Sequence, residues 1–195
     1  MAKSPSAGRI KRRLAASISA VPAARFYRTC LAHTLMRLGR DPRWRTVVAV
    51  SPDSEVGAPH WPRGIERVPQ GHGDLGMRMH RLFRRLPPGP AIIVGSDIPA
   101  INSSDVARAF RLLGSADAVF GRAPDGGYWL VGLRRAPRIL SPFARVRWSS
   151  PHALADTLRN LGGRRVAFAA TLSDVDTEED YRASRGDFER LITSR

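Results

Sequence analysis

Apolar residues recur along the chain in two alternating patterns. Between residues 23 and 38 they return at helical spacing, and Gly39 follows as a stop signal. The short runs at 46–50 and 91–94 are almost wholly apolar, which is typical of strands buried on both faces. The same alternation continues toward the C-terminus. We expect helices at 23–38, 74–86, 103–113, 150–161 and 177–192, and strands at 46–50, 91–94, 116–120, 128–133 and 166–169.

This alternation predicts an α/β protein. Apolar strands separated by helices come together in a largely parallel sheet that helices cover on both faces. We therefore predict a three-layer α/β/α sandwich with a mostly parallel mixed sheet, formed by a single domain over residues 1–195. In such sheets, ligands bind beyond the carboxyl ends of the strands. The residues that follow each predicted strand are therefore the first candidates for a functional site.

The charge of the chain is unusual in kind. There are 32 Lys and Arg residues against 17 Asp and Glu, a formal net charge of +15, and only Lys3 and Lys11 are lysines. Such a surface attracts polyanions: nucleic acids, nucleotides, phosphorylated metabolites or an acidic membrane. Arginine-rich coding and solvated arginine side chains explain the same excess, so the charge alone does not decide the function.

Composition excludes several classes of protein. No apolar run approaches the roughly 20 residues of a membrane-spanning helix, so we expect no membrane span. Cys30 is the single cysteine, which excludes a disulfide framework, and its place on the apolar face of a helix indicates a core residue. The segment 11–24 has the order of a signal peptide, but its apolar stretch is short and holds two serines. We therefore expect a cytoplasmic protein.

The N-terminal segment 3–14 is rich in cations and small residues, with five Lys or Arg side chains within residues 3–13 around Gly8. A glycine-containing loop lets backbone N–H groups approach phosphate oxygens, while Lys and Arg neutralise their charge. A triphosphate would suit such a loop. A disordered basic tail would have the same composition, and the spacing alone leaves both interpretations open.

Carboxylates follow one predicted strand and recur near the C-terminus. Asp97 comes directly after the strand at 91–94 and can hold Mg²⁺ or Mn²⁺, or it can cap the turn before the next helix. Asp174 and Asp176 alternate on one side of an extended segment, and either can supply a second metal oxygen. Capping of the last helix by Asp176 or Thr177 is the alternative, and both roles can coexist.

Two glycine-containing motifs remain. In the sequence Asp-Gly-Gly-Tyr-Trp at 125–129, the glycines allow a close backbone approach and the aromatic rings can line a base or a sugar, although a hairpin turn explains the same residues. A glycine-rich stretch at 71–79 enters a helix whose N-terminus suits an anion, or Asp74 simply caps that helix. The histidines show no metal spacing, and no serine or cysteine lies in a nucleophile motif.

Taken in order, these five segments resemble the blocks of a bacterial family of nucleotidyl- or glycosyltransferases with the nucleotide-diphospho-sugar transferase (GT-A) fold. Relatives of that family include the 2-phospho-L-lactate guanylyltransferases and the molybdenum-cofactor guanylyltransferases. The resemblance covers nearly the whole chain. The opening phosphate loop of the family corresponds to residues 2–14, and later blocks correspond to 73–79, 95–99, 125–130, 147–149 and 174–180. These blocks in this order are specific for the family, but they do not specify the reaction.

The resemblance implies a role for each motif. The nucleotide would be bound by Lys3, Gly8, Lys11, Arg13, Asp74 and Arg78. The acceptor would be bound by Asp125, Gly126, Gly127 and Tyr128. Asp97 would bind the metal together with Asp176, for which Asp174 is the substitute candidate. Asp97, Lys11 and Arg13 would be the catalytic residues, because the lysine and the arginine would stabilise charge on the leaving phosphates.

The chain departs from the family pattern in the phosphate loop and at its start. Ala7 replaces a proline and Arg12 replaces a threonine of the loop, and Ile98 replaces a common cysteine. The family has an apolar strand before the loop, whereas here Met1 falls inside the motif. We therefore expect either a start that is placed too late or a fold without its first strand, which would leave neighbouring backbone groups unpaired.

The leading hypothesis is a transferase that uses Mg²⁺ or Mn²⁺ and an activated nucleotide, either an NTP or an NDP-sugar. It would move a nucleotidyl or glycosyl group to a small, phosphorylated acceptor. An ionised acceptor phosphate needs no general base, in agreement with the missing catalytic histidine. Two alternatives remain: a non-catalytic nucleic-acid-binding protein that uses its arginine surface, and a nucleotide sensor. We expect no specific nucleic acid as a partner, and a homodimer stays open.

Overall fold

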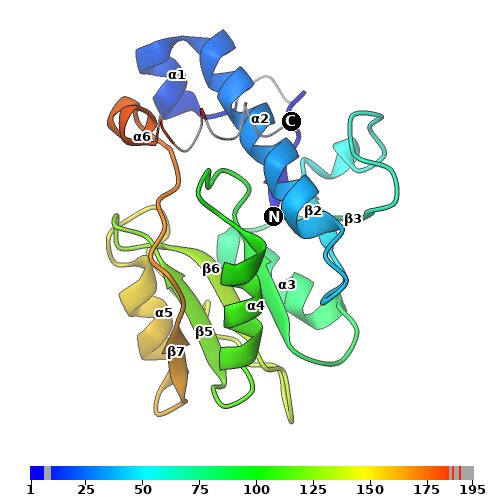
Figure 1. Ribbon diagram of the computed structural model, residues 1–195. Coiled ribbons are helices and arrows are strands. Elements are labelled where there is room, and N and C mark those ends of the chain that lie inside the picture. Colours follow the sequence, from blue (N-terminus) through cyan, green and yellow to red (C-terminus); the bar gives the residue numbers. More distant parts are fainter. Residues whose placement is uncertain (7–9, 185, 187–188, 190–195) are drawn as a thin grey trace. The chain divides into compact units, whose positions relative to one another are not determined.

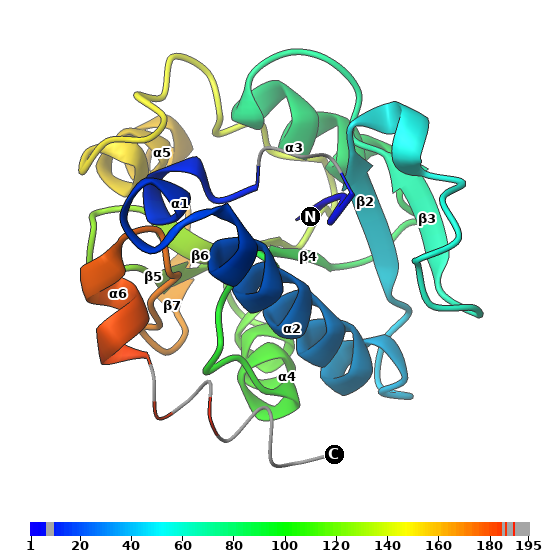
Figure 2. The ribbon, with the colours of Figure 1, turned by 90° about the horizontal axis from the view of Figure 1, so that it is seen from above.

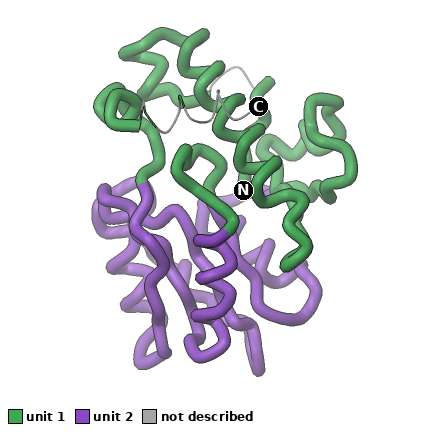
Figure 3. Tube along the Cα trace, viewed as in Figure 1, with its two compact units in different colours: residues 1–69, 95–103, 173–195 green, residues 70–94, 104–172 purple. Residues whose placement is uncertain are grey.

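The computed structural model describes residues 1–6, 10–184, 186 and 189. The chain divides into two compact units, each assembled from segments far apart in the sequence (Figure 3). Unit 1 comprises residues 1–69, 95–103 and 173–195, and unit 2 comprises residues 70–94 and 104–172. The single domain predicted over 1–195 stays a prediction.

Unit 1 is built on a parallel sheet (Figure 1). Its strands β1 (Ala2–Lys3), β2 (Val47–Ser51) and β3 (Glu66–Pro69) lie in the order β1-β2-β3, and both pairs are parallel. The first strand, which the sequence left in doubt, is present but only two residues long. The helices are α1 (Arg12–Ile18), α2 (Ala20–Gly39), the 3-10 helix η1 (Asp53–Glu55) and α6 (Glu178–Ala183).

Helix α2 forms two apolar contacts within unit 1. One side packs on β2, where Tyr27, Leu31 and Leu35 join Val48 and Val50 in one buried cluster. Each buried aliphatic side chain of this kind contributes about 1.5–3 kcal/mol. These contacts fix α2 against the strand that pairs with β1.

The other side of α2 joins α1 and the C-terminal segment. Leu14, Phe26, Cys30 and Val175 form a second buried cluster, and α6 lies beside α1 in both views (Figures 1 and 2). Cys30 is 1% exposed, as expected for a core residue, and burial raises the pKa of its thiol to about 12. The cluster brings the N-terminal basic segment and the C-terminal acidic segment together.

Unit 2 is a mixed sheet with helices on both faces. Its strands β4 (Ala91–Val94), β5 (Ala118–Arg122), β6 (Tyr128–Leu133) and β7 (Val166–Phe168) lie in the order β4-β6-β5-β7. β6 is antiparallel to β4 and β5, and β7 is parallel to β5. Helix α4 (Ser103–Leu112) lies on one face, and α3 (Leu75–Arg85) and α5 (Ala153–Leu161) lie on the other (Figures 1 and 2). The predicted α/β class and layering are confirmed.

The structure differs from the expected elements mainly where local signals are weak. Helix α1 has no side-chain cap and no acidic residue in its first turn, so no start signal marks it. β3 is half-buried, ends in Pro69 and was not predicted. Helix α6 begins after Thr177 as expected and is described to Ala183, and much of the expected helix beyond it lies outside the described residues. Among the described helices, none has the length and apolar character to cross a bilayer.

Candidate metal and phosphate site

Asp97 lies in unit 1, in the segment that follows β4, and its side chain is 26% exposed. The hydroxyl of its buried neighbour Ser96 lies 3.2 Å from the hydroxyl of Tyr27. Tyr27 Oη also donates to the carbonyl of Lys3 and accepts from its amide N–H, each at 2.8 Å. Burial raises the pKa of Tyr27 to about 12, so the hydroxyl keeps its proton. One buried tyrosine thus connects the end of β1 to the segment that carries Asp97.

Asp174 and Asp176 reach the same place from the C-terminal segment. Val175 between them is fully buried, so the two flanking carboxylates share the opposite side of the chain, as their alternation predicts. One oxygen each of Asp97, Asp174 and Asp176 lies within 4.8 Å of the others. Oxygen ligands bind Mg²⁺ at about 2.1 Å, so two oxygens that bind the same ion are at most about 4.2 Å apart. A small movement of the side chains would bring the three oxygens within this distance. The three carboxylates therefore suit one hard divalent cation.

The capping of α6 does not occupy Asp176. The hydroxyl of Thr177 accepts from the amide of Asp180 at 3.2 Å, and the Asp180 carboxylate accepts from the amides of Asp176 and Thr177 at 3.0 and 2.8 Å. This reciprocal capping box satisfies the first turn of the helix. The cap expected at Asp176 or Thr177 is therefore Thr177, and the Asp176 side chain faces the site.

Lys11 lies between two of the carboxylates. Its ammonium donates to Asp176 Oδ1 at 2.6 Å and forms an ion pair with Asp97, and its side chain is only 5% exposed. Burial alone lowers the pKa of Lys11, but the two carboxylates outweigh burial and hold the pKa above its ordinary value. Lys11 also has a left-handed backbone, with φ 50° and ψ 51°, a conformation that costs about 1–2 kcal/mol for a side chain of its kind. The strained backbone of Lys11 thus accompanies the placement of its ammonium between the two carboxylates.

The other candidates of the N-terminal loop are less constrained. Lys3 and Arg13 are exposed, which leaves both side chains accessible to a ligand. The pKa of Asp180 lies below its ordinary value. Burial raises this pKa, but the hydrogen bonds from Thr177 and the nearby charge of Arg13 lower it further than burial raises it. Gly8 lies outside the described residues.

Asp74 and Arg78 lie in unit 2 and have local structural roles. Asp74 caps α3 by accepting from the amide of Met77 at 2.8 Å. Of the two roles considered for Asp74, the structure therefore shows the helix cap. Arg78 Nε donates to the carbonyl of Gly73 at 2.9 Å. Their predicted place beside a nucleotide stays a prediction.

Residues 125–127 lie in the turn of the β5–β6 hairpin, and Tyr128 begins β6. The Asp125 carboxylate accepts from the amide of Gly127 at 2.9 Å, and Gly126 has φ +84°. A Cβ at Gly126 would lie 2.2 Å from the carbonyl oxygen of Pro151 in the same unit, so glycine is required there. The Tyr128 hydroxyl points to Thr157 Oγ1 at 3.4 Å, and burial raises its pKa. The acceptor role predicted for these residues stays a prediction.

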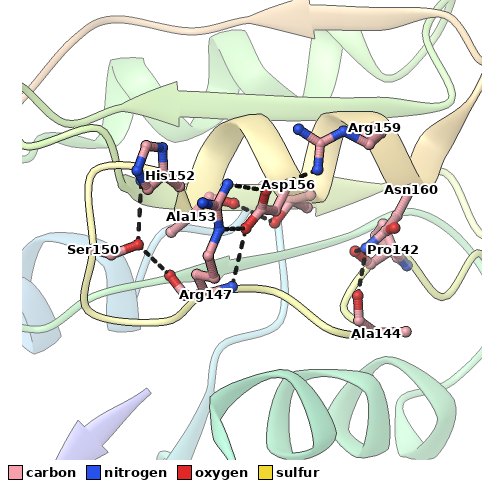
Figure 4. Close-up of polar contacts among 10 residues, drawn as sticks. Pro142, Ala144, Arg147, Ser150, His152, Ala153, Asp156, Arg159 and Asn160 are labelled. Carbon is pink, nitrogen blue, oxygen red and sulfur yellow. Dashed lines mark hydrogen bonds and ion pairs between the residues drawn. The ribbon is translucent and has the colours of Figure 1, made fainter.

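The loop before α5 is held by one buried carboxylate (Figure 4). Asp156, 4% exposed, accepts from the backbone amide, Nε and Nη2 of Arg147 at 3.1, 2.8 and 2.8 Å, and from Arg159 at 3.0 Å. The hydrogen bonds from Arg147 hold the pKa of Asp156 well below its ordinary value of 3.8. This contact fixes the segment 147–149, one of the family blocks recognised in the sequence.

Sequence reasoning missed Tyr27 and Asp156. Tyr27 lies on the apolar face of a helix, where a core tyrosine gives the same pattern. Asp156 lies within a helix that carries other polar residues. Their roles depend on partners 24 and 9 residues away, which no local pattern specifies.

Solved structures share this fold. A crystal structure from Desulfovibrio desulfuricans G20, described as a "putative nucleotide-diphospho-sugar transferase", is 23% identical, covers 97% of this chain and 95% of that chain, and has a TM-score of 0.81. A Mycobacterium tuberculosis Rv0371c homolog from Mycobacterium sp. strain JC1 is 20% identical over 83% of this chain and 84% of that chain, with a TM-score of 0.59. Rv0371c from Mycobacterium tuberculosis H37Rv is 19% identical over 79% and 82%, with a TM-score of 0.58. The expected GT-A fold is confirmed.

No curated protein matches the chain. The family DUF2064, described as "Uncharacterized protein conserved in bacteria", matches residues 34–150, which include Asp97 and the hairpin turn. Since this match spans more than half of the sequence, the chain belongs to the DUF2064 family and has the fold of a nucleotide-diphospho-sugar transferase.

Proposed function

We propose that this protein is a divalent-metal-dependent transferase that takes an NTP or an NDP-sugar and moves a nucleotidyl or glycosyl group to a small, phosphorylated acceptor. The observation that carries the proposal is the convergence of Asp97, Asp174 and Asp176, two of which, Asp97 and Asp176, pair with the buried ammonium of Lys11. The fold shared with nucleotide-diphospho-sugar transferases agrees with it.

The donor set fits a hard cation. All three candidate ligands are carboxylate oxygens, the donors that Mg²⁺ and Mn²⁺ prefer, and no sulfur or imidazole is among them. Asp97, Asp174 and Asp176 would hold the metal, and the ion, when bound, supplies positive charge to the phosphates of the nucleotide. Lys11 already neutralises part of the charge of these carboxylates, so the site can form before a metal arrives.

Lys11 and the exposed cations of the N-terminal segment would bind the phosphates. Once released from the carboxylates, the ammonium of Lys11 can donate to phosphate oxygens and stabilise the charge that the leaving phosphates gain. Lys3 and Arg13 are exposed and can add further donors to the same anion. The phosphates of the nucleotide would therefore replace Asp97 and Asp176 as the negatively charged partners of Lys11.

The group transfer balances in either version. In nucleotidyl transfer, an oxygen of the ionised acceptor phosphate forms a bond to the α-phosphorus of the NTP, the bond to the β-phosphate oxygen breaks, and pyrophosphate leaves. In glycosyl transfer, the acceptor oxygen forms a bond to the anomeric carbon and loses its proton to solvent. The bond from the anomeric carbon to the diphosphate oxygen breaks, and a nucleoside diphosphate leaves. The leaving group therefore distinguishes the two reactions.

A thermal-shift screen tests the proposal. NTPs and NDP-sugars are added to the intact protein with and without Mg²⁺ or Mn²⁺, and a true ligand raises the Tm by binding the folded state. We expect a shift for one class of nucleotide that requires metal, and assays for released pyrophosphate or nucleoside diphosphate then identify the reaction. If neither nucleotide class shifts the Tm with either metal, the proposal is wrong. A shift that is independent of metal and lost with added salt would favour the polyanion-binding alternative.

A further inference from the structure

A hydrogen-bonded chain of side chains runs from η1 to the start of the N-terminal loop. Ser4, fully buried, donates from its hydroxyl to Glu55 Oε2 at 3.0 Å. His60 Nε2 lies 3.3 Å from Ser4 Oγ, and His60 Nδ1 lies 3.2 Å from Ser6 Oγ. The amide of Ser6 donates to Ser4 Oγ at 3.3 Å. Both ring nitrogens of His60 are therefore used, and both are directed at the same short segment of the loop.

Trp61 holds the buried end of these hydrogen-bonded side chains in place. Trp61, 3% exposed, donates from its indole to the carbonyl of Glu55 at 2.8 Å, and its ring lies 4.8 Å from the ring of His60. Ser6, by contrast, is exposed. The arrangement thus leads from a buried anchor to a solvent-accessible hydroxyl.

The direction of each proton follows from the donors and acceptors. An ionised Glu55 only accepts, so it takes the single proton of Ser4, and Ser4 Oγ must accept from Nε2–H of His60. A neutral ring then has a lone pair at Nδ1, which accepts the proton of Ser6. A doubly protonated ring donates from Nδ1 instead, and the Ser6 proton becomes free to donate outward.

We propose that His60 is a positioning residue for phosphate binding, which turns the hydroxyl of Ser6 outward as a donor to a phosphate oxygen. The inference rests on the proposed function, because Ser6 lies within the predicted phosphate loop. When a phosphate oxygen accepts the Ser6 proton, Ser6 Oγ can only accept from His60, so Nδ1 must then be the donor.

Charged side chains of the described residues also lie at this segment. Glu55 on η1 reaches His60 through Ser4, and Arg28 on α2 donates to the carbonyl of Pro5 at 3.5 Å. Lys3 on β1 precedes the segment and is exposed. Arg28 and Lys3 are therefore further cations beside the segment that carries Ser6.

Two substitutions of His60 separate its contacts. His60→Asn can place an amide N–H where Nδ1 lies and donate to Ser6 at any pH, so it mimics the cationic ring. His60→Gln places its amide near Nε2, which keeps the contact to Ser4 and loses the one to Ser6. Ser6→Ala removes the donor itself, and Ser54→Ala, at an exposed serine of η1, is the matched control.

The probe is inorganic triphosphate with Mg²⁺, measured by calorimetry on the intact protein. We expect Ser6→Ala and His60→Gln each to weaken binding about tenfold, the loss typical of one hydrogen bond to a charged group. The double variant should be no weaker than either single variant. Ser54→Ala and His60→Asn should bind as the wild type does, since neither substitution removes a donor to Ser6 or to the phosphate.

The outcomes separate the inference from the function on which it rests. If the wild type binds triphosphate and both His60→Gln and Ser6→Ala bind equally well, the role of His60 is wrong and the transferase proposal stands. Additive losses, or a His60→Asn variant as weak as His60→Gln, also overturn the role of His60. If the wild type itself shows no binding, the phosphate site fails, and the inference fails with it. Thermal melts without ligand confirm that each variant is folded.

Discussion

The ammonium of Lys11 lies 2.6 Å from Asp176 Oδ1, although 165 residues separate the two in the sequence. The same ammonium pairs with Asp97, so one buried cation joins the N-terminal loop, the segment after β4 and the C-terminal segment. A lysine in this position satisfies the carboxylates while no other cation is bound. In the proposed function, Lys11 would therefore compete with a metal ion for these carboxylates and would bind the phosphates together with that ion.

This competition predicts opposite effects of one substitution. Lys11→Met should tighten the binding of Mn²⁺ in the absence of nucleotide by at least about tenfold, because a positive charge and its two ion pairs are removed from the site. It should weaken the binding of triphosphate, because a donor to phosphate is lost. Mn²⁺ titration by electron paramagnetic resonance and calorimetry with triphosphate measure the two affinities.

Lys3→Met is the matched control, since Lys3 is the other lysine of the chain and is exposed. It should leave the affinity for Mn²⁺ unchanged. Changes of the same sign in both affinities of Lys11→Met would contradict the competition.

The hydroxyl of Tyr27 supports a second prediction. Tyr27→Phe removes the hydrogen bonds to both backbone groups of Lys3 and the contact with Ser96 in a buried setting. We expect a loss of on the order of 2 kcal/mol in the free energy of unfolding, measured in urea. Tyr128→Phe is the comparison, because its hydroxyl makes one contact of 3.4 Å to Thr157. An equal loss in both variants would show that the Tyr27 network has no special weight.

Asp156 predicts a dependence of stability on pH. The bonds from Arg147 lower its pKa in the folded state, so Asp156 stabilises the fold above its ordinary value of 3.8 and loses that contribution as the pH falls below it. Asp156→Asn should therefore unfold at a lower temperature than the wild type at about pH 6, with a smaller difference at about pH 3. Thermal melts at both values measure this difference. Glu179→Gln, at an exposed carboxylate of α6, controls for a general loss of charge. A constant gap between wild type and Asp156→Asn would contradict the assigned shift.

The carboxylates of the site could be predicted because each is marked by residues next to it in the sequence. Asp97 comes after a buried strand, and Asp174 and Asp176 flank a buried valine, so both patterns are local. The hairpin turn at 125–127 and the cap at Asp74 are local for the same reason. At Asp74 and at Asp125 the contacts show the capping and turn roles, and the binding roles of these two residues stay predictions.

The remaining features depend on contacts between distant segments. The sequence marks Lys11 as a cation in a basic loop, but its burial between two carboxylates comes from the packing of α1, α2 and the C-terminal segment. Tyr27 has the spacing of an ordinary core residue, and His60 has no motif at all. Such roles arise from three-dimensional neighbours, which periodicity does not encode.

The most direct measurement is a Mn²⁺ titration of the wild type and of Asp97→Asn, followed by electron paramagnetic resonance. The account predicts one Mn²⁺ per chain for the wild type and an affinity at least about tenfold lower for Asp97→Asn. Asp41→Asn, at a carboxylate of the same unit that pairs with Arg43, should bind as the wild type does. Binding by Asp97→Asn that equals the wild type, or no Mn²⁺ binding by the wild type, would contradict the metal site and the transferase proposal built on it.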